Sequence, residues 1–175
     1  MYLKQLSLIN FKNYASLEAQ FSPKINCFVG NNGMGKTNLL DAIYYLSFCK
    51  SFFNSIDSQN ITHHENFFVL QGLFSSGNED IEIYCGIKKN HKKIFKRNKT
   101  EYERLSDHIG QIPLVMISPD DIEIINGSSE TRRKFLDSII SQYDKHYLEK
   151  LILYNQALKQ RNALLKQFHE TRNFL

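Results

Sequence analysis

Residues 30–37 read Gly-Asn-Asn-Gly-Met-Gly-Lys-Thr, and their spacing matches the phosphate-binding P-loop pattern G-x-x-x-x-G-K-T. Glycine lets the backbone turn sharply and approach phosphate oxygens without a Cβ in the way. The amides of such a loop point inward as an anion nest, and the helix that follows adds the positive end of its dipole. The pattern predicts an ATP site formed by Gly30, Asn31, Asn32, Gly33, Met34, Gly35, Lys36 and Thr37.

Two side chains of this loop have specific expected roles. Lys36 is expected to reach the β- and γ-phosphates of ATP, and the Thr37 hydroxyl is expected to ligate Mg²⁺. The expected cofactors are therefore ATP and Mg²⁺. The alternative is a glycine-rich turn that binds nothing, and a Lys36→Ala protein with unchanged affinity for Mg-ATP would favour it.

A carboxylate that activates water is harder to place. The apolar run at residues 114–117 is followed by Asp120 and Asp121, as in a Walker B strand, but Ser118 and Pro119 separate the acids from the run. We interpret the acids as part of a strand-end loop near the γ-phosphate and assign no catalytic residue. This chain by itself is expected to be a feeble ATPase at most.

A dense basic stretch lies at residues 88–99 and contains no acidic residue. It predicts a hairpin that contacts the DNA backbone through Lys92, Lys93, Lys96 and Arg97, with Phe95 packed behind it. The alternative is a solvated hairpin whose lysines protect the edge of a sheet.

Two pairs of residues are assigned structural roles rather than roles in metal or DNA binding. His63 and His64 have no third metal ligand nearby in the sequence and are assigned to a loop. Arg132 and Arg133 fit salt bridges on a helix surface, with a contact to DNA as the alternative.

The composition is that of a globular domain rather than a disordered chain, with 175 residues, 42% hydrophobic and 23% charged. A net charge of +4 permits a polyanionic partner without requiring one. The cysteines are three, widely spaced and without a C-x-x-C motif, which argues against disulfides or zinc and favours a reducing, cytoplasmic location. Cys27 and Cys85 are expected to pack as small hydrophobes in strands. Neither a secretory signal nor an apolar run of membrane-spanning length is recognised.

The elements that position the loop follow from the hydrophobic pattern. Leu39, Leu40, Ile43 and Leu46 are expected to form the buried face of the helix after the loop. A turn at Gly77-Asn78 is expected to join two strands. Strands are predicted at residues 2–10, 14–21, 25–29, 67–74, 80–87, 93–97 and 114–117.

The C-terminal part differs, because residues 128–175 contain neither Gly nor Pro. Ser128 or Ser129 is expected to cap a first helix and Asp144 a second one. A domain boundary is predicted near Asn126, with a P-loop lobe at 1–126 and a helical arm that starts at 127–175. An apolar stripe for arm packing on the second helix is formed by Leu148, Leu151, Ile152, Leu158, Leu165 and Phe168.

Several segments together resemble the RecF family of DNA-repair ATPases, which is related to SMC heads. Residues 6–14 and the P-loop with residues 40–44 behind it are similar to segments that RecF shares with SMC heads. Residues 117–137, which contain Ser-Pro-Asp-Asp, Asn-Gly and Arg-Arg-Lys-Phe-Leu-Asp, and residues 158–166 resemble RecF segments that SMC proteins do not carry.

The resemblance implies an α/β fold, the first lobe of an ABC-type ATPase head followed by the start of an α-helical arm. It also implies that the signature motif, the Walker B strand and the switch region lie in a C-terminal half outside this chain. Lys12 and Asn13 match the turn that approaches the phosphates. No glutamine follows Ile117 where the family has its Q-loop glutamine, and Asp120 is a candidate to replace it.

The implied function is ATP-dependent DNA binding in recombinational repair. Two heads would sandwich ATP, clamp single-stranded or gapped duplex DNA as a homodimer, and act with RecR and RecO. The full-length protein would be a weak DNA-dependent ATPase.

Three alternatives remain open at this point. An SMC-like or OLD-type head of another DNA-processing system would share the front motifs. A P-loop kinase would need a lid and an acceptor pocket, and a pure binding module would hold ATP without hydrolysis.

Overall fold

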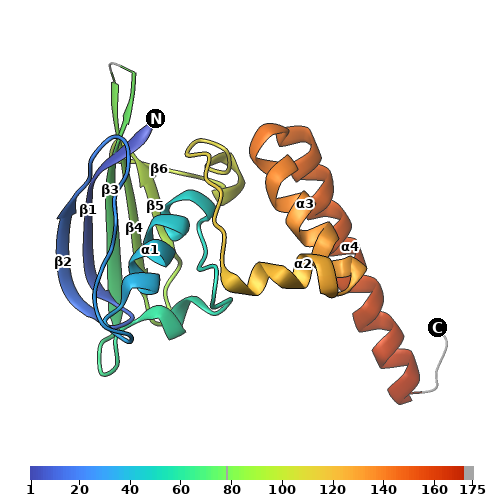
Figure 1. Cartoon of the computed structure of the whole chain (residues 1–175). Helices are drawn as coiled ribbons and strands as arrows, with labels where there is room; N and C mark the ends of the chain where they lie inside the picture. Colours follow the sequence, from blue (N-terminus) through green and yellow to red (C-terminus); the bar gives the residue numbers. More distant parts are fainter. Residues whose placement is uncertain (78, 172–175) are drawn as a thin grey trace. The chain divides into compact units, whose positions relative to one another are not determined.

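The computed structural model of the chain describes residues 1–77 and 79–171. It contains two compact units, Met1–Met116 and Ile117–Leu175 (Figure 1). The P-loop belongs to the first unit. The second unit begins ahead of the predicted boundary at Asn126, so the division into a lobe at 1–126 and an arm at 127–175 stays a proposal about function.

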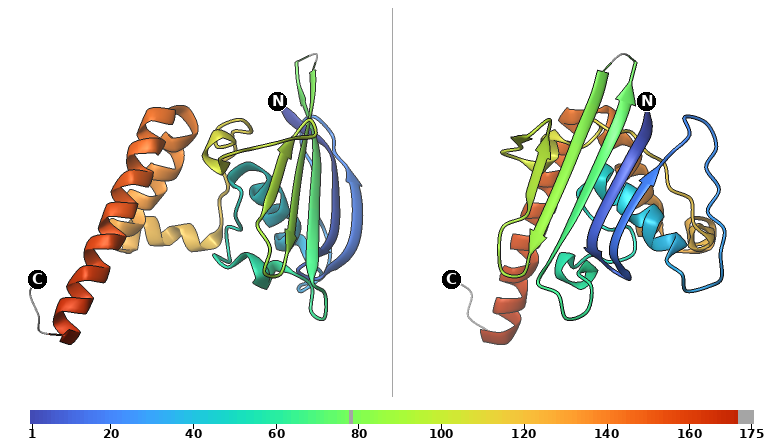
Figure 2. Two further views of the ribbon diagram at one scale, coloured as in Figure 1. Left: turned by 180° about the vertical axis from the view of Figure 1, so that it is seen from behind. Right: turned by 90° about the vertical axis from the view of Figure 1, so that its left-hand side faces the viewer.

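The first unit contains one antiparallel sheet with the strand order β2-β1-β3-β4-β5-β6. The right-hand view of Figure 2 shows these strands side by side. Alternating apolar residues form them because every second side chain points to the same face. The strands are β1 (Tyr2–Phe11), β2 (Tyr14–Gln20), β3 (Phe67–Ser76), β4 (Glu79–Lys88), β5 (Ile94–Arg97) and β6 (Thr100–Glu101).

Most of the predicted strands are confirmed, with shifts of a few residues at their ends. Gly77 lies between β3 and β4 at φ 64°, a left-handed conformation that suits a tight turn. The other predicted turn residue, Asn78, lies outside the described residues.

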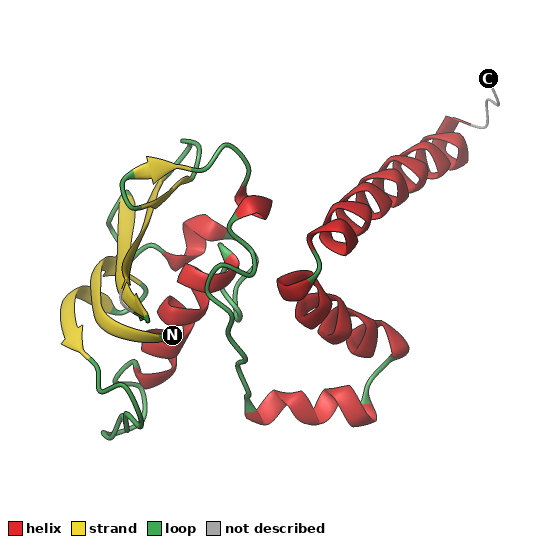
Figure 3. Ribbon diagram, turned by 90° about the horizontal axis from the view of Figure 1, so that it is seen from above, coloured by secondary structure: helices red, strands yellow, loops and turns green. Residues whose placement is uncertain are grey.

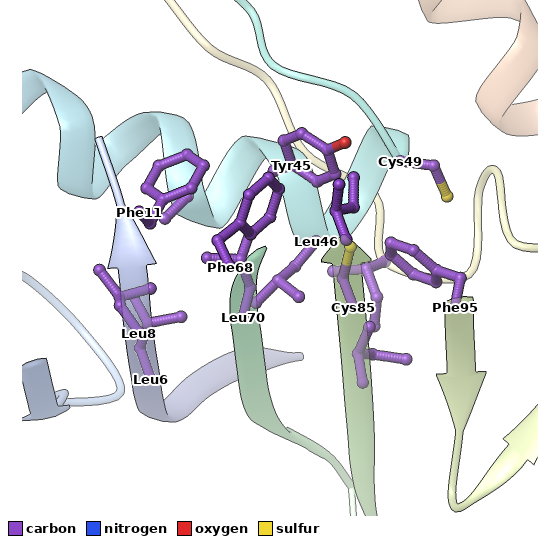
Figure 4. Close-up of a cluster of buried hydrophobic side chains, with 14 of the residues drawn as sticks. Leu6, Leu8, Phe11, Tyr45, Leu46, Cys49, Phe68, Leu70, Cys85 and Phe95 are labelled. Atoms are coloured by element: carbon purple, nitrogen blue, oxygen red, sulfur yellow. The ribbon is translucent and has the colours of Figure 1, made fainter. Parts of the chain in front are cut away.

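Helix α1 (Lys36–Phe48) covers one face of the sheet and closes the hydrophobic core. Figure 4 shows Tyr45 and Leu46 of α1 above side chains from β1, β3, β4 and β5. The predicted burial of Leu39 and Leu46 is confirmed, whereas Leu40 is 44% exposed. The buried stripe instead continues through Ala42 and Tyr45, because positions three and four residues apart share a helix face.

Two predicted strands are wrong. Residues 25–29 and 114–117 form no strand and are not part of the sheet, and both lie entirely within the described part of the chain. Val29 is 91% exposed and Ile117 is 83% exposed, and Cys27 is exposed rather than packed. An apolar run becomes a strand only when a neighbouring strand supplies hydrogen bonds, and the edge strands β2 and β6 do not pair with these segments.

Short turns connect these elements, at η1 (Asp57–Asn60) and η2 (Leu105–Asp107). His63 and His64 lie in the loop between η1 and β3, as predicted. Among the described residues, no cluster of three or more His, Cys, Asp or Glu side chains could hold a metal ion.

The second unit is helical, with η3 (Pro119–Asp121), α2 (Ile122–Asn126), α3 (Ser129–Tyr143) and α4 (Lys145–Thr171) in succession (Figure 3). Ser128 caps α3 by accepting a hydrogen bond from Thr131 N at 3.3 Å, and Asp144 caps α4 by accepting one from Tyr147 N at 3.0 Å. Both predicted caps are confirmed.

The partner of Arg132 on α3 and the exposure of the apolar stripe on α4 differ from what the sequence predicted. Arg132 donates a hydrogen bond to Gly127 O at 3.0 Å, so it closes the end of α2 instead of bridging to an acid there. On α4, Leu148 and Leu158 of the predicted stripe are half-buried, but Ile152 is 44% and Leu165 is 49% exposed. None of the described helices combines the length and apolar character that crossing a membrane requires.

Candidate nucleotide-binding site

The P-loop follows segment 25–29, which is not a strand, and runs directly into α1. Gly33 has φ 82° and Gly35 has φ 98°, conformations that an L side chain rarely adopts. A Cβ placed on Gly33 would meet nothing within 4 Å, so the space over the loop is open. A hollow of about 260 Å³ lies there, and it is lined by Asn32, Gly33, Gly35, Lys36, Thr37 and Asn38.

The N-terminus of α1 faces this hollow. Gly35 is the N-cap residue, and it provides no side-chain hydrogen bond to the amides of the first helical turn. Uncapped first-turn amides and the helix dipole favour an anion at this position. The thirteen residues of α1 make it long enough for that effect.

Lys36 bends back over the loop. Its Nζ donates to Gly30 O at 2.7 Å and to Asn31 O at 2.8 Å. These bonds hold the ammonium at the loop, beside the hollow. Thr37 is exposed at the start of α1 and also lines the hollow.

The turn between β1 and β2 lies against the loop. Asn13 Oδ1 accepts a hydrogen bond from Asn38 Nδ2 at 2.7 Å, and Tyr14 OH donates to Gly35 O at 3.1 Å. A Cβ on Gly35 would come within 2.5 Å of Asn13 Nδ2. Tyr14 and Asn38 were not predicted as site residues. Their only signal in the sequence is that they are polar and lie next to recognised motif residues.

Lys12 is not among the residues that line the hollow, and its side chain pairs with a buried carboxylate. Its Nζ lies 2.6 Å from Asp41 Oδ2, and the Asp41 side chain is fully buried. Asp41 was also missed as a functional candidate, although a carboxylate between the apolar residues of a helix indicates a buried partner. The phosphate contact predicted for Lys12 stays a prediction, and so does the one predicted for Asn13.

Asp121 makes a local structural contact in η3. Its Oδ2 accepts a hydrogen bond from Ser118 N at 2.7 Å, which caps the short turn. The segment before it is not a strand, so Asp121 does not end a Walker B strand in this structure. The substitution of Asp120 for a Q-loop glutamine remains untested.

The four cations predicted to contact DNA fall into two groups. Lys93 pairs with Asp57 at 2.8 Å and donates to Cys49 O at 2.6 Å, and Arg97 donates to Gln111 Oε1 at 2.7 Å. Lys92 is exposed, and Lys96 lies 5.9 Å from the centre of the Tyr84 ring. Lys92 and Lys96 are therefore better placed than Lys93 or Arg97 to meet a polyanion.

An antiparallel sheet packed on a P-loop helix, followed by a helical segment, defines the N-terminal lobe of an ABC-type ATPase head. The chain belongs to the RecF/RecN/SMC N-terminal domain family, whose model matches residues 2–117. The resemblance found in the sequence is thereby confirmed.

Curated relatives agree with this assignment. The chain is 63% identical over 171 residues to the DNA replication and repair protein RecF of Phocaeicola vulgatus, a match that covers 97% of this chain and 46% of the relative. It is 54% identical over 168 residues to the protein of the same name from Flavobacterium johnsoniae, covering 96% of this chain and 47% of that protein. The chain thus spans about half the length of the curated relatives it matches.

Solved structures share the fold. A structure of the recombination mediator protein RecF-ATP in the RecFOR pathway superimposes with a TM-score of 0.88 at 37% identity, covering 97% of this chain and 46% of that one. An SMC ATPase structure superimposes with a TM-score of 0.64 at 20% identity, covering 79% of this chain and 99% of that one, which shows a common fold alone.

Proposed function

We propose that this chain is the nucleotide-binding lobe of a RecF-type ATPase of DNA repair and that it binds Mg-ATP through residues 30–37. The observation that carries the proposal is the open hollow at the uncapped N-terminus of α1, with the Lys36 ammonium beside it. Backbone amides and Lys36 would hold the phosphates, and Thr37 would hold Mg²⁺. The RecF-ATP structure, which is similar over nearly the whole chain, supports the same proposal.

Calorimetric titration with Mg-ATP tests the nucleotide site. Lys36→Ala removes the charge beside the hollow, so we expect at least a tenfold loss of affinity, or about 1.4 kcal/mol. Lys50→Ala is the matched control, because Lys50 is exposed and does not line the hollow. Equal affinity of the two variants would contradict the proposal.

We further propose that the nucleotide serves ATP-dependent DNA binding in recombinational repair. The relatives are named DNA replication and repair proteins, and the similar structures belong to the RecFOR pathway. The proposed assembly is a homodimer of heads on single-stranded or gapped duplex DNA, with RecR and RecO as partners. In this proposal residues 1–126 act as the head lobe and residues 127–175 as the beginning of the arm.

The sheet face opposite α1 supports a contact with DNA. A hollow of about 250 Å³ lies on strands β3, β4 and β5, and its lining combines Phe67, Tyr84 and Ile94 with Lys88, His91 and Lys92. Phe67 is 41% and Ile94 is 39% exposed. Aromatic surfaces beside cations suit stacked bases and phosphates of a single strand.

Charge reversal tests this face. Lys92→Glu with Lys96→Glu is expected to weaken binding of single-stranded DNA and to reduce the salt slope by about 0.7 for each phosphate contact that is lost. Lys24→Glu is the control, because it makes the same charge reversal at an exposed lysine in the loop after β2. Fluorescence anisotropy over a range of salt concentrations measures both quantities, and an unchanged slope for the double variant would exclude this face.

A further inference from the structure

A buried ion pair connects the β1–β2 turn to helix α1. Lys12 Nζ and Asp41 Oδ2 are 2.6 Å apart, and the side chains are 15% and 0% exposed. The ammonium also lies 5.7 Å from the ring centre of Phe11 and 5.4 Å from that of Phe53, so aromatic faces surround it. A charge pair withdrawn from water in this way is expensive to desolvate and adds little net stability compared with apolar side chains.

Both oxygens of Asp41 have further partners. Oδ1 accepts a hydrogen bond from Phe52 N at 2.7 Å, and Oδ2 accepts one from Ser51 Oγ at 2.6 Å. Asp41 thus ties together α1, the loop after α1 and the β1–β2 turn.

The β1–β2 turn also touches the P-loop. Lys12 has φ 52°, and its backbone amide donates to Asn60 O at 2.8 Å, so its backbone is held as well as its side chain. The next two residues are Asn13, bonded to Asn38, and Tyr14, bonded to Gly35 O. Gly35 is the residue immediately before Lys36, so the turn contacts the loop directly beside its lysine.

We propose that Lys12 and Asp41 are a positioning pair that holds Asn13 and Tyr14 against Gly35 and thereby sets the shape of the P-loop. This inference rests on the proposed ATP site and assigns Lys12 to the support of that site rather than to the phosphates. The geometry favours support over contact, because the Lys12 ammonium is already neutralised by a fully buried carboxylate. Removal of either charge leaves the other buried without its counter-ion, and the turn is then expected to shift.

A double-mutant cycle with Lys12→Met and Asp41→Asn tests the pair, because each substitution removes a charge and keeps most of the side-chain shape. Each single variant is expected to lose ATP and ADP affinity alike, by roughly tenfold. The double variant is expected to regain most of the loss, and Lys12→Arg to bind like the unchanged chain. Lys4→Met is the control, because it breaks the solvent-exposed Lys4–Asp80 pair of the same unit.

Tyr14→Phe supplies a second test that does not disturb the buried charges. It removes only the hydrogen bond to Gly35 O, so ATP affinity is expected to fall about threefold, or roughly 0.6 kcal/mol, at an unchanged thermal midpoint. A purely structural role would lower the thermal midpoint of Asp41→Asn and leave the nucleotide affinity of all folded variants unchanged, which would overturn the proposal.

A direct phosphate contact gives a different pattern. Lys12→Met would then lose affinity for ATP more than for ADP, and Asp41→Asn would not weaken binding, which also overturns the proposal. Lys36→Ala in the same series distinguishes a failure of the proposed ATP site from a failure of the positioning pair. If Lys36→Ala binds ATP with normal affinity, the proposed ATP site itself is wrong. If Lys36→Ala loses ATP affinity while the Lys12 and Asp41 variants keep it, only the positioning pair is rejected.

Discussion

At the residue scale, the P-loop depends on glycine for backbone conformation as well as for space. Gly35 has φ 98° and is buried under the β1–β2 turn, with Asn13 where a side chain would begin. Gly77 also has a positive φ, 64°, but a Cβ there would meet nothing within 4 Å. A side chain would strain the backbone at both glycines, but it would crowd a neighbouring residue only at Gly35, so comparing the two separates these effects.

Gly35→Ala is expected to destabilise the chain by about 1–3 kcal/mol and to lower ATP affinity, because strain and the contact with Asn13 both distort the loop. Gly77→Ala is expected to lower stability by about 1–2 kcal/mol with no effect on ATP affinity. Urea denaturation and calorimetric titration measure the two effects. Equal ATP affinities in the two variants would show that Gly35 is not required for the shape of the site.

At the element scale, a buried histidine connects the end of α1 to the segment after β6. His108 is fully buried, with Nε2 donating to Leu46 O at 2.7 Å and Nδ1 accepting from Tyr102 OH at 3.1 Å. Burial lowers the pKa of His108 from 6.5 to about 4. The hydrogen bond to Leu46 O acts in the opposite direction and raises the pKa, whereas the charge of nearby Arg97 lowers it further. The neutral ring is therefore part of the folded structure.

This pKa predicts a loss of stability in acid. Between pH 6.5 and about 4 the unfolded chain binds a proton at His108 that the folded chain does not, so the free energy of unfolding falls as the pH falls. The contribution of His108 to the free energy of unfolding is of the order of 3 kcal/mol, and it is fully present above pH 6.5. Denaturation at several pH values should show a shallower dependence for His108→Gln, and an unchanged one for the exposed control His63→Gln. An identical slope in all three proteins would contradict the assignment.

At the scale of the whole molecule, the described residues provide groups that hold phosphate more clearly than groups that activate water. Asp41 is buried against Lys12, and Asp121 caps its own turn. Nucleotide binding and nucleotide turnover should therefore separate in this chain.

We expect this chain to bind Mg-ATP but to release phosphate near the background rate, and Asp120→Asn to leave that rate unchanged. A steady-state phosphate-release assay checks both points, with Lys36→Ala as the binding-deficient reference. Rapid turnover that depends on Asp120 would restore a catalytic role for the acids after residue 117.

Local features of this protein were predictable from the sequence because they depend on neighbouring residues. The P-loop pattern, the alternation in β1, β3 and β4, and the caps Ser128 and Asp144 all involve residues close together in the chain. Such features follow from backbone geometry and short hydrogen bonds, which the order of residues determines.

The tertiary structure decided the features that need a distant partner. Apolar residues 25–29 and 114–117 resemble strands, yet neither segment is a strand of the sheet in the described chain. Lys93 resembles a DNA contact, yet Asp57 neutralises it, as Asp41 does Lys12. Hydrogen bonding between strands and the neutralisation of buried charge act through space between residues far apart in the chain, so a linear pattern identifies the candidates but only the folded molecule assigns their partners.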